Sequence, residues 1–433
     1  MISAVNLTNI AFLVLGVIGA CLALIGMLGA LKGTPVRCVK AFGGGDRPAV
    51  HDSAFRDTVE MLVHAHLAHA HSVEIFINGD QTYPKFWDDL RAARESITIQ
   101  LYYCEPGRMA DTFRDILVER ARAGVRILFL VDAFGSALPK EYMESLEAAG
   151  IGTCVFRPLR VWQANTIQHR SHARAICIDG TIGWTGGFGL ADKWYGNGRD
   201  KDQWRDSNIR FTGPAVRQLQ ATFAACWGEA AGDLLIGPML FPPPAAPSNE
   251  GVLAGMLHAR PSVGSTDAER FYALSMECAR QKFYLTNSYF VPDNDFRNML
   301  CAAASRGVDT RVLTVGPSTD IKSTLYAGRA HYEELLASGV RIYEYRDTMM
   351  HAKTFVMDGM WGAVGSMNAD NRSMSFNEES MFMMLDAELG ATLERQFTED
   401  LEYADEIDLA VFRKRPMLDR VKERAAHLVR RVL

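Results

Sequence analysis

The chain of 433 residues repeats its own order of structural elements, and this duplication constrains the fold most strongly. In the first half, a strand-like run at 96–103 precedes a helical stretch, the buried-strand run 125–132, a second helical stretch and a strand-like run at 151–156. In the second half, runs at 282–290, 308–315 and 340–345 follow in the same order, offset by about 183–189 residues. Strands that alternate with helices predict an α/β fold with a mixed or parallel sheet in each half.

In each half, the strands and helices are followed by a motif that contains a histidine, a cationic residue and an aspartate. His172, Arg174 and Asp179-Gly180 in the first half match His351, Lys353 and Asp358-Gly359 in the second, 179 residues later. Residues i and i+2 of a strand point the same way, so each histidine should share a face with its cation. A single His-x-Lys on a strand is common and weak evidence, but two copies inside a larger repeat favour function. A base that works near neutral pH, beside a fixed cation, suits attack on a phosphodiester.

Further polar residues follow each motif. Ser366 and Asn368 stand two apart after the second motif and could donate hydrogen bonds to phosphate oxygens, whereas the first half has Gly187 and Gly189 there. A later acid also appears in each half, and a carboxylate bound to an imidazole fixes the tautomer and stabilises the charged ring. These acids are Asp206 and Glu379.

The duplicated H-x-K-x4-D pattern, followed by G-S-x-N, resembles the phospholipase D superfamily over roughly residues 73–433. Longer strings are similar to the cardiolipin synthase branch, and they include SYFVPD at 288–293, ASGVRIYEY at 337–345 and NADNRS at 368–373. Two positions depart from the family pattern: Arg174 replaces a lysine and Gly189 replaces an asparagine. Arginine keeps the charge but is not equivalent to an ammonium group, so the first half could be tuned or weakened.

The resemblance implies two tandem phospholipase D-like α/β/α domains about a pseudo-twofold axis, with both motifs in one active site. His172 would be the nucleophile and His351 the acid and base, although the pseudo-symmetry leaves the reverse open. Arg174, Lys353, Asn368 and Ser366 would hold the phosphoryl oxygens, with Asp206 and Glu379 orienting the imidazoles. Asp179 and Asp358 belong to the motif, but a turn-stabilising role is as good a reading as a chemical one. No metal or other cofactor is required, because side chains supply the cations.

The implied reaction is phosphatidyl transfer between phospholipids, with phosphatidylglycerol giving cardiolipin and glycerol. Alternatives are a phospholipase D that uses water, and a non-catalytic lipid-binding protein with a degenerate first half. A nucleic-acid phosphodiesterase ranks below these, because the formal net charge of −5 is unlike that of proteins that cover nucleic acid with positive charge. Oligomeric state leaves no signal in the sequence.

An uncharged run of 22 residues from Ile10 to Leu31 is long enough to cross a bilayer. A cleaved leader, a lipoprotein signal and a buried core helix are the alternatives; the first needs a basic start, and no Lys or Arg precedes Lys32. Lys32, Arg37 and Lys40 follow the run, so the positive-inside rule places the catalytic part in the cytoplasm, at the inner membrane.

The predicted organisation has six parts. They are a transmembrane anchor (1–33), a linker and helix (34–71), domain 1 (72–231), a Pro-rich linker (232–266), domain 2 (267–402) and a basic amphipathic helix (403–433). The helix at 417–433 carries an apolar stripe and an excess of Arg and Lys, so it either lies on an anionic membrane or packs on the catalytic core. Four histidines at 64, 66, 69 and 71 lack metal-ligand spacing and read as a polar helix end.

Overall fold

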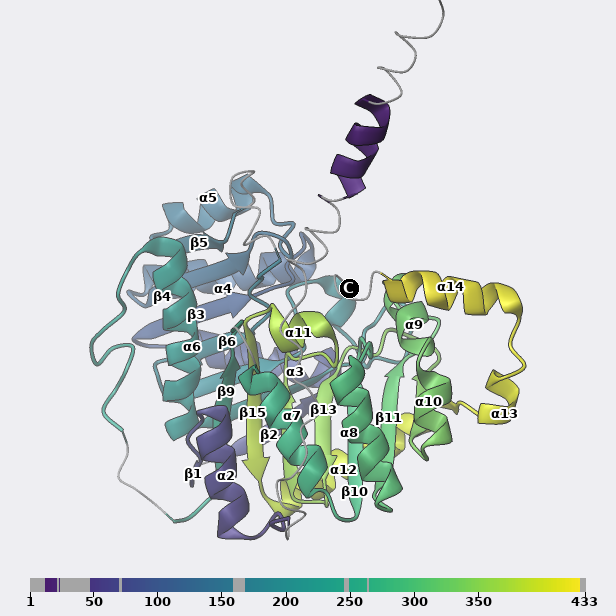
Figure 1. Ribbon diagram of the computed structural model, residues 1–433. Coiled ribbons are helices and arrows are strands. Elements are labelled where there is room, and N and C mark those ends of the chain that lie inside the picture. Colours follow the sequence, from purple (N-terminus) through teal and green to yellow (C-terminus); the bar gives the residue numbers. More distant parts are fainter. Residues whose placement is uncertain are drawn as a thin grey trace, which may run out of the picture.

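The computed structural model describes residues 12–21, 23, 47–69, 72–158, 168–244, 249–262 and 265–428. Two mixed sheets with helices on their faces make up the body (Figure 1). The first sheet has seven strands in the order β2-β8-β7-β6-β3-β4-β5. Their bounds are β2 Val73–Ile77, β3 Ser96–Leu101, β4 Arg126–Asp132, β5 Gly152–Phe156, β6 Ala175–Ile178, β7 Ile182–Gly186 and β8 Ser207–Thr212.

The second sheet has nine strands in the order β1-β9-β15-β14-β13-β10-β11-β12-β16. Their bounds are β1 Ala68–His69, β9 Leu253–Ala259, β10 Lys282–Asn287, β11 Asp309–Val315, β12 Arg341–Tyr345, β13 Lys353–Met357, β14 Trp361–Gly365, β15 Glu379–Leu385 and β16 Ala404–Glu406. From β9 to β12 its order and strand directions repeat those of the first sheet from β2 to β5. The predicted duplicated α/β fold is therefore confirmed.

Helices cover both sheets. In the first half they are α3 Asn78–Ala92, α4 Arg108–Arg122, α5 Lys140–Ala148 and α6 Pro214–Ala231. The others are α2 Ser53–Val63, α7 Asp267–Cys278, α8 Asn294–Ser305, α9 Lys322–Arg329, α10 Tyr332–Ala337, α11 Asn371–Ser375, α12 Ala387–Leu401, α13 Leu409–Phe412 and α14 Met417–Leu428. In Figure 1, α7 and α8 lie in front of the second sheet and α12 lies behind it.

Apolar runs explain why these segments form central strands. In β4, six of the seven residues from Arg126 to Asp132 are buried, which is typical of a strand covered on both faces. Helix α4 buries Phe113, Ile116 and Leu117 against this sheet. The spacing of three and four residues puts them on one helical face.

The two sheets pack against each other through corresponding strands, β7 and β8 against β14 and β15. Phe211 of β8 and Phe382 of β15 lie across this contact, with ring centroids 4.4 Å apart. Single backbone bridges also cross between the halves, from Ser171 to Glu378 and from Arg205 to Met350. The contact therefore brings the start of β6 close to residues just before β15, and the start of β13 close to residues just before β8.

Three predicted boundaries are corrected. The proposed linker 232–266 contains β9, a strand inside the second sheet, because all of its prolines lie outside Leu253–Ala259. The helix predicted within 34–71 is α2; together with strand β1 it packs on α7 and β9, so residues 53–69 belong to the second half. Strand β16 pairs with β12 and lies in the proposed C-terminal segment.

The predicted membrane span and histidine cluster fall partly outside the described residues. Residues 12–21 and 23 are helical and exposed, and the rest of 10–31 is not described. Within the described chain no helix is long and apolar enough to cross a membrane. His64 and His66 pair separately with Asp267 and Glu60, while His69 bonds to a backbone carbonyl; His71 is not described.

Candidate active site

Both motif histidines lie in extended chain just ahead of a strand, rather than on it. His172 precedes β6 and His351 precedes β13. The backbone N–H of His172 donates to the carbonyl of Glu378 at 2.9 Å, and that of His351 donates to the carbonyl of Arg205 at 2.7 Å. Each histidine is therefore held in place by a segment from the opposite half.

The carboxylates also cross between the halves. Nδ1 of His172 lies 2.9 Å from Oε2 of Glu379, and Nδ1 of His351 lies 2.9 Å from Oδ2 of Asp206. All four side chains are buried. A carboxylate at Nδ1 fixes the proton there and leaves the lone pair on Nε2 for chemistry.

Different donors hold the two carboxylates. Glu379 accepts hydrogen bonds from the hydroxyls of Ser366 (2.5 Å) and Ser373 (2.6 Å) and from the amide of Asn377. Ser366 is fully buried and also bonds to the backbone of β15, so the prediction that it binds phosphate is corrected: it holds Glu379. Ser373 was not predicted in this role, because it lies on α11 beyond the motif.

Asp206 is held by a residue that sequence reasoning missed. Trp194 donates its indole N–H to Oδ2 of Asp206 at 2.8 Å. The two glycines of the first half make room for this arrangement. A Cβ at Gly187 would lie 2.2 Å from the Asp206 carboxylate, and a Cβ at Gly189 would lie 3.0 Å from the Trp194 ring. The departure at Gly189 therefore has a steric reason.

The two cations occupy corresponding places. Lys353 Nζ donates to the hydroxyl of Ser288 and the carbonyl of His351, each at 2.6 Å, and lies 2.9 Å from Nε2 of His351. Arg174 Nη1 donates to the carbonyl of His172 at 2.5 Å, and its Nε donates to the carbonyl of Phe188 at 3.2 Å. Each cation thus binds the backbone of its own motif histidine.

Burial and the clustered positive charge govern the protonation of the site. Burial, reinforced by Arg174, lowers the pKa of His172 to about 4, and burial with Lys353 lowers that of His351 to about 3. Burial alone would raise the pKa of Asp206 and Glu379, but their imidazole partners bring it below its usual range. Both rings are therefore neutral in the empty site at pH 7, with Nε2 unprotonated.

A cavity of about 270 Å³ joins the two histidines, and Arg174 and Asn368 line it too. The Oδ1 atom of Asn368 is buried and has no hydrogen-bond partner among the described residues. Aromatic rings flank the histidines, with Tyr102 4.8 Å from His172 and Trp204 5.1 Å from His351 between centroids. The cavity thus offers two imidazoles, the guanidinium groups of Arg174 and Arg372 and the amide of Asn368 to one small anionic group, with the acids Asp320 and Asp370 also in its lining.

The motif aspartates lie at the other ends of the strands. Asp179 accepts backbone N–H groups from residues 94–96, and Asp358 accepts them from residues 280–282. Both adopt a positive φ, 51° and 50°, where each motif strand turns. Neither lines the cavity. Their placing among the catalytic residues is corrected in favour of the turn-stabilising reading.

One group among the described residues has ligand atoms close enough to hold a metal ion. These are Cys226, His258 and Glu378, whose candidate atoms lie within 4.8 Å of one another. His258 Nε2 already lies 2.7 Å from a Glu378 oxygen, as in an ordinary ion pair. None of the three lines the cavity.

Lys353 should make the protein less stable. Burial lowers the pKa of Lys353 to about 7 in the folded protein, whereas the unfolded chain has the ordinary value of 10.5. Between these two pH values the unfolded chain binds more protons than the folded protein, so the free energy of unfolding rises with pH. The loss of stability caused by burying the Lys353 ammonium is complete below pH 7 and disappears as the pH rises towards 10.5. We expect Lys353→Met to raise the free energy of unfolding at pH 7 by on the order of 3 kcal/mol, and the gain to shrink by pH 10.

Denaturant unfolding at the two pH values measures this effect. Lys140→Met is the matched control, because Lys140 is 83% exposed and should change stability by no more than about 0.5 kcal/mol. A Lys353→Met protein that is less stable than the parent at pH 7 would contradict the prediction.

Comparisons with known proteins agree with this geometry. A family profile described as "Cardiolipin synthase, PLD-like domain" matches residues 274–401. Over 362 residues the chain is 32% identical to the cardiolipin synthase of Geobacillus kaustophilus, covering 83% of this chain and 72% of that protein. Over 400 residues it is 30% identical to cardiolipin synthase 1 of Bacillus anthracis, covering 90% and 74%.

Among solved structures, the fold is similar to that of phosphatidylserine synthase from Haemophilus influenzae. The TM-score is 0.67 at 10% sequence identity, and the match covers 88% of this chain and all of the other. At this identity the likeness supports the fold alone.

Proposed function

The chain belongs to the cardiolipin synthase family of phosphatidyltransferases, and we propose that it joins two phosphatidylglycerol molecules into cardiolipin and glycerol. The observation that carries the proposal is the pair of buried imidazoles in one cavity, each with a carboxylate from the opposite half at Nδ1. Two such groups can divide a transfer reaction into two displacements at phosphorus.

We assign the attack to His172, because the two Nε2 atoms differ. Nε2 of His351 lies 2.9 Å from the Lys353 ammonium, which engages its lone pair. No hydrogen bond to Nε2 of His172 occurs among the described residues. A lone pair without a competing donor is the better nucleophile.

In the first step, Nε2 of His172 forms a bond to phosphorus, and the bond from phosphorus to the oxygen of the headgroup glycerol breaks. His351, protonated once the anionic substrate offsets the neighbouring cations, gives its proton to the leaving oxygen. In the second step, His351 takes the proton from a hydroxyl of the second phosphatidylglycerol. That oxygen bonds to phosphorus and His172 leaves, so both imidazoles return to their starting state.

Arg174, which lines the cavity, would hold the negative oxygens during both steps, with the amide of Asn368 as a further donor and with Lys353 adding positive charge from beside His351. Preorganised donors of this kind act strongly in a buried cavity, because no solvent has to rearrange. Asp206 and Glu379 would fix the imidazole tautomers and stabilise each ring when it is charged.

The direct test is to supply purified protein with radiolabelled phosphatidylglycerol and separate the products. Cardiolipin and free glycerol in equal amounts support the proposal. Phosphatidic acid as the main product would instead assign a hydrolase that uses water, and absence of turnover would leave a lipid-binding protein.

The reaction should not depend on a metal ion, because Lys353 and Arg174 supply positive charge at the reacting group. We expect EDTA to leave the initial rate of cardiolipin formation unchanged. Loss of activity with EDTA and its recovery on adding a divalent ion would contradict this prediction.

Arg174→Lys should be tolerated. A lysine there could still donate to the carbonyl of His172, as Lys353 does to that of His351, and would lose only the bond to Phe188. We expect a rate within about tenfold of the parent, whereas Arg174→Ala should lose about 10²-fold or more. Equal loss in both variants would mean that the guanidinium geometry is required, and equal rates in all three proteins would mean that this cation is idle.

The same proposal places the enzyme at the cytoplasmic membrane. The uncharged segment from Ile10 to Leu31 would anchor it, and Lys32, Arg37 and Lys40 would keep the catalytic part on the cytoplasmic side. Resistance of the full chain to extraction by alkaline carbonate tests the anchor.

A further inference from the structure

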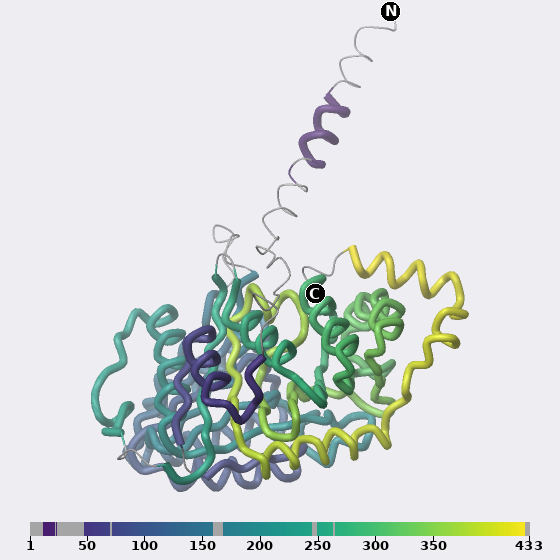
Figure 2. The backbone as a smooth tube through the Cα atoms, turned by 60° about the horizontal axis from the view of Figure 1, so that its bottom comes forward, coloured from purple at the N-terminus to yellow at the C-terminus, as the bar shows by residue number. Residues whose placement is uncertain are grey.

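Helix α14 is attached to the body through a polar face. Glu423 is buried and its carboxylate accepts hydrogen bonds from Nε and Nη2 of Arg415, which also donates to Glu333 of α10. His427 Nδ1 lies 2.8 Å from Nε2 of His331. Figures 1 and 2 both show α14 lying along α9. The helix is thus fixed in orientation by ion pairs and hydrogen bonds.

The opposite face of α14 is apolar and exposed. The exposed fractions are 80% for Met417, 64% for Leu418, 52% for Val421 and 79% for Leu428. At 100° per residue these four side chains fall within one sector, on the side away from Glu423. We call this sector the α14 stripe. A helix that only packs on a core would bury its apolar stripe, so this orientation is the reverse of the usual one.

The charged residues around the α14 stripe indicate what kind of surface binds it. Lys422 and Arg424 are exposed and fall on the two sides of the stripe, whereas Asp419 and Glu423 lie on the opposite side of the helix. Arg413 and Lys414, just before the helix, are exposed as well. An apolar stripe edged by cations complements an anionic lipid surface.

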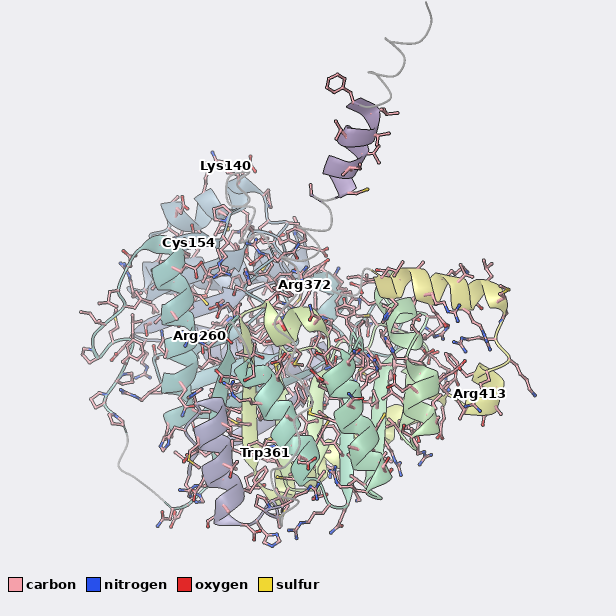
Figure 3. The ribbon with its side chains drawn as sticks, viewed as in Figure 1. Lys140, Cys154, Arg260, Trp361, Arg372 and Arg413 are labelled. Carbon is pink, nitrogen blue, oxygen red and sulfur yellow. The ribbon has the colours of Figure 1, made fainter. Side chains whose placement is uncertain are left out.

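Helix α14 and the cavity have α9 as a common neighbour. Helix α14 packs on α9, whose Thr324 lines the cavity together with Ile321 just before it. Ile321 is 42% exposed, and Phe134, which lines the cavity from the first half, is 59% exposed. In Figure 3, α14 lies at about the same height as Arg372, a cavity residue on α11. Exposed apolar side chains therefore occur both on α14 and in the cavity lining, and α9 contacts both.

We propose that the α14 stripe, with Ile321 and Phe134, docks on an anionic lipid bilayer and holds the cavity mouth against it. This inference rests on the proposed function in one respect, namely that the substrates are membrane lipids. Docking would let a headgroup enter the cavity while its acyl chains stay in the bilayer. It also assigns α14 an orienting role that a membrane anchor at the other end of the chain cannot supply.

The test uses the full chain in nanodiscs of phosphatidylglycerol and in neutral detergent, with amide hydrogen exchange read over residues 417–428. We expect exchange to be about tenfold or more slower in the anionic nanodiscs. Leu418→Asp/Val421→Asp should abolish this protection. The matched control is Leu234→Asp/Ile236→Asp, since these side chains are 85% and 73% exposed away from α14 and should not affect it.

Two results would overturn the docking proposal. One is equal exchange in nanodiscs and detergent, or protection that survives Leu418→Asp/Val421→Asp. The other is protection in detergent that grows with protein concentration, which would mean that a second copy of the chain covers the stripe. Turnover of short-chain phosphatidylglycerol below its micelle concentration tests the proposed function separately: the stripe variant should match the parent there and fall about tenfold or more on bilayers.

Discussion

Replacing His172 by alanine should lower cardiolipin formation by about 10⁴-fold or more, because the variant lacks the atom that bonds to phosphorus. The protein should still fold. Glu379 would lose one partner but keep the hydroxyls of Ser366 and Ser373 and the amide of Asn377. Circular dichroism and the thermal midpoint check the fold, and the initial rate with labelled phosphatidylglycerol checks the activity.

A second measurement, of the covalent histidine intermediate, makes the test specific. With the phosphorus of the phosphatidyl group labelled, parent protein quenched in denaturant at alkaline pH, where the acid-labile P–N bond survives, should carry label on histidine, and the His172→Ala protein should carry none. His258→Gln is the matched control, since His258 also pairs with a glutamate, at 2.7 Å from Glu378, but lies outside the cavity lining. Its rate should stay within about threefold of the parent. Retained labelling in His172→Ala would assign the nucleophile to another residue.

Much of the fold could be predicted from the sequence because its signals are local and occur twice. Strand runs such as 126–132, glycine turns and the repeated motif all act within a few residues of chain. The missed strand β9 shows the limit of such signals. Its sequence, LAGMLHA, has weak strand propensity, and it becomes a strand because β15 supplies a ladder partner along its whole length.

The residues of the site were predicted, but not which carboxylate pairs with which histidine. The sequence pointed to two histidines, two cations and two acids, yet nothing in it says that Glu379 serves His172 and Asp206 serves His351. That pairing arises where the sheets meet, and packing between distant segments leaves no periodic trace. Ser366 and Asn368 stand two apart, a spacing that would put them on one face of a continuing strand, but β14 ends at Gly365. Beyond that point alternation no longer applies, so Ser366 turns to Glu379 and Asn368 to the cavity.

Helix α14 shows a different limit. The sequence predicts that this helix is amphipathic, but it does not show which face packs on the rest of the protein. The buried pair of Glu423 and Arg415 decides this in the structure, and the polar face is the one that packs.

Replacing His351 by alanine should separate the two chemical steps and thereby identify the roles of the two histidines. With phosphatidylglycerol the rate should fall by about 10²–10⁴-fold, because the leaving glycerol oxygen needs a proton. A phosphatidyl ester of p-nitrophenol needs no such proton, since its phenolate is a stable leaving group. We therefore expect His351→Ala to release close to one p-nitrophenolate per active site and then stop.

The stop is as informative as the burst. The second step needs a base for the incoming hydroxyl, and Lys353, which lies 2.9 Å from Nε2 of His351 in the parent, does not line the cavity. The covalent intermediate should therefore accumulate on His172, where peptide mapping can locate it. A burst in His172→Ala together with none in His351→Ala would exchange the two roles. Because the two halves share one strand order, this kinetic asymmetry and the site of labelling together decide between the two roles.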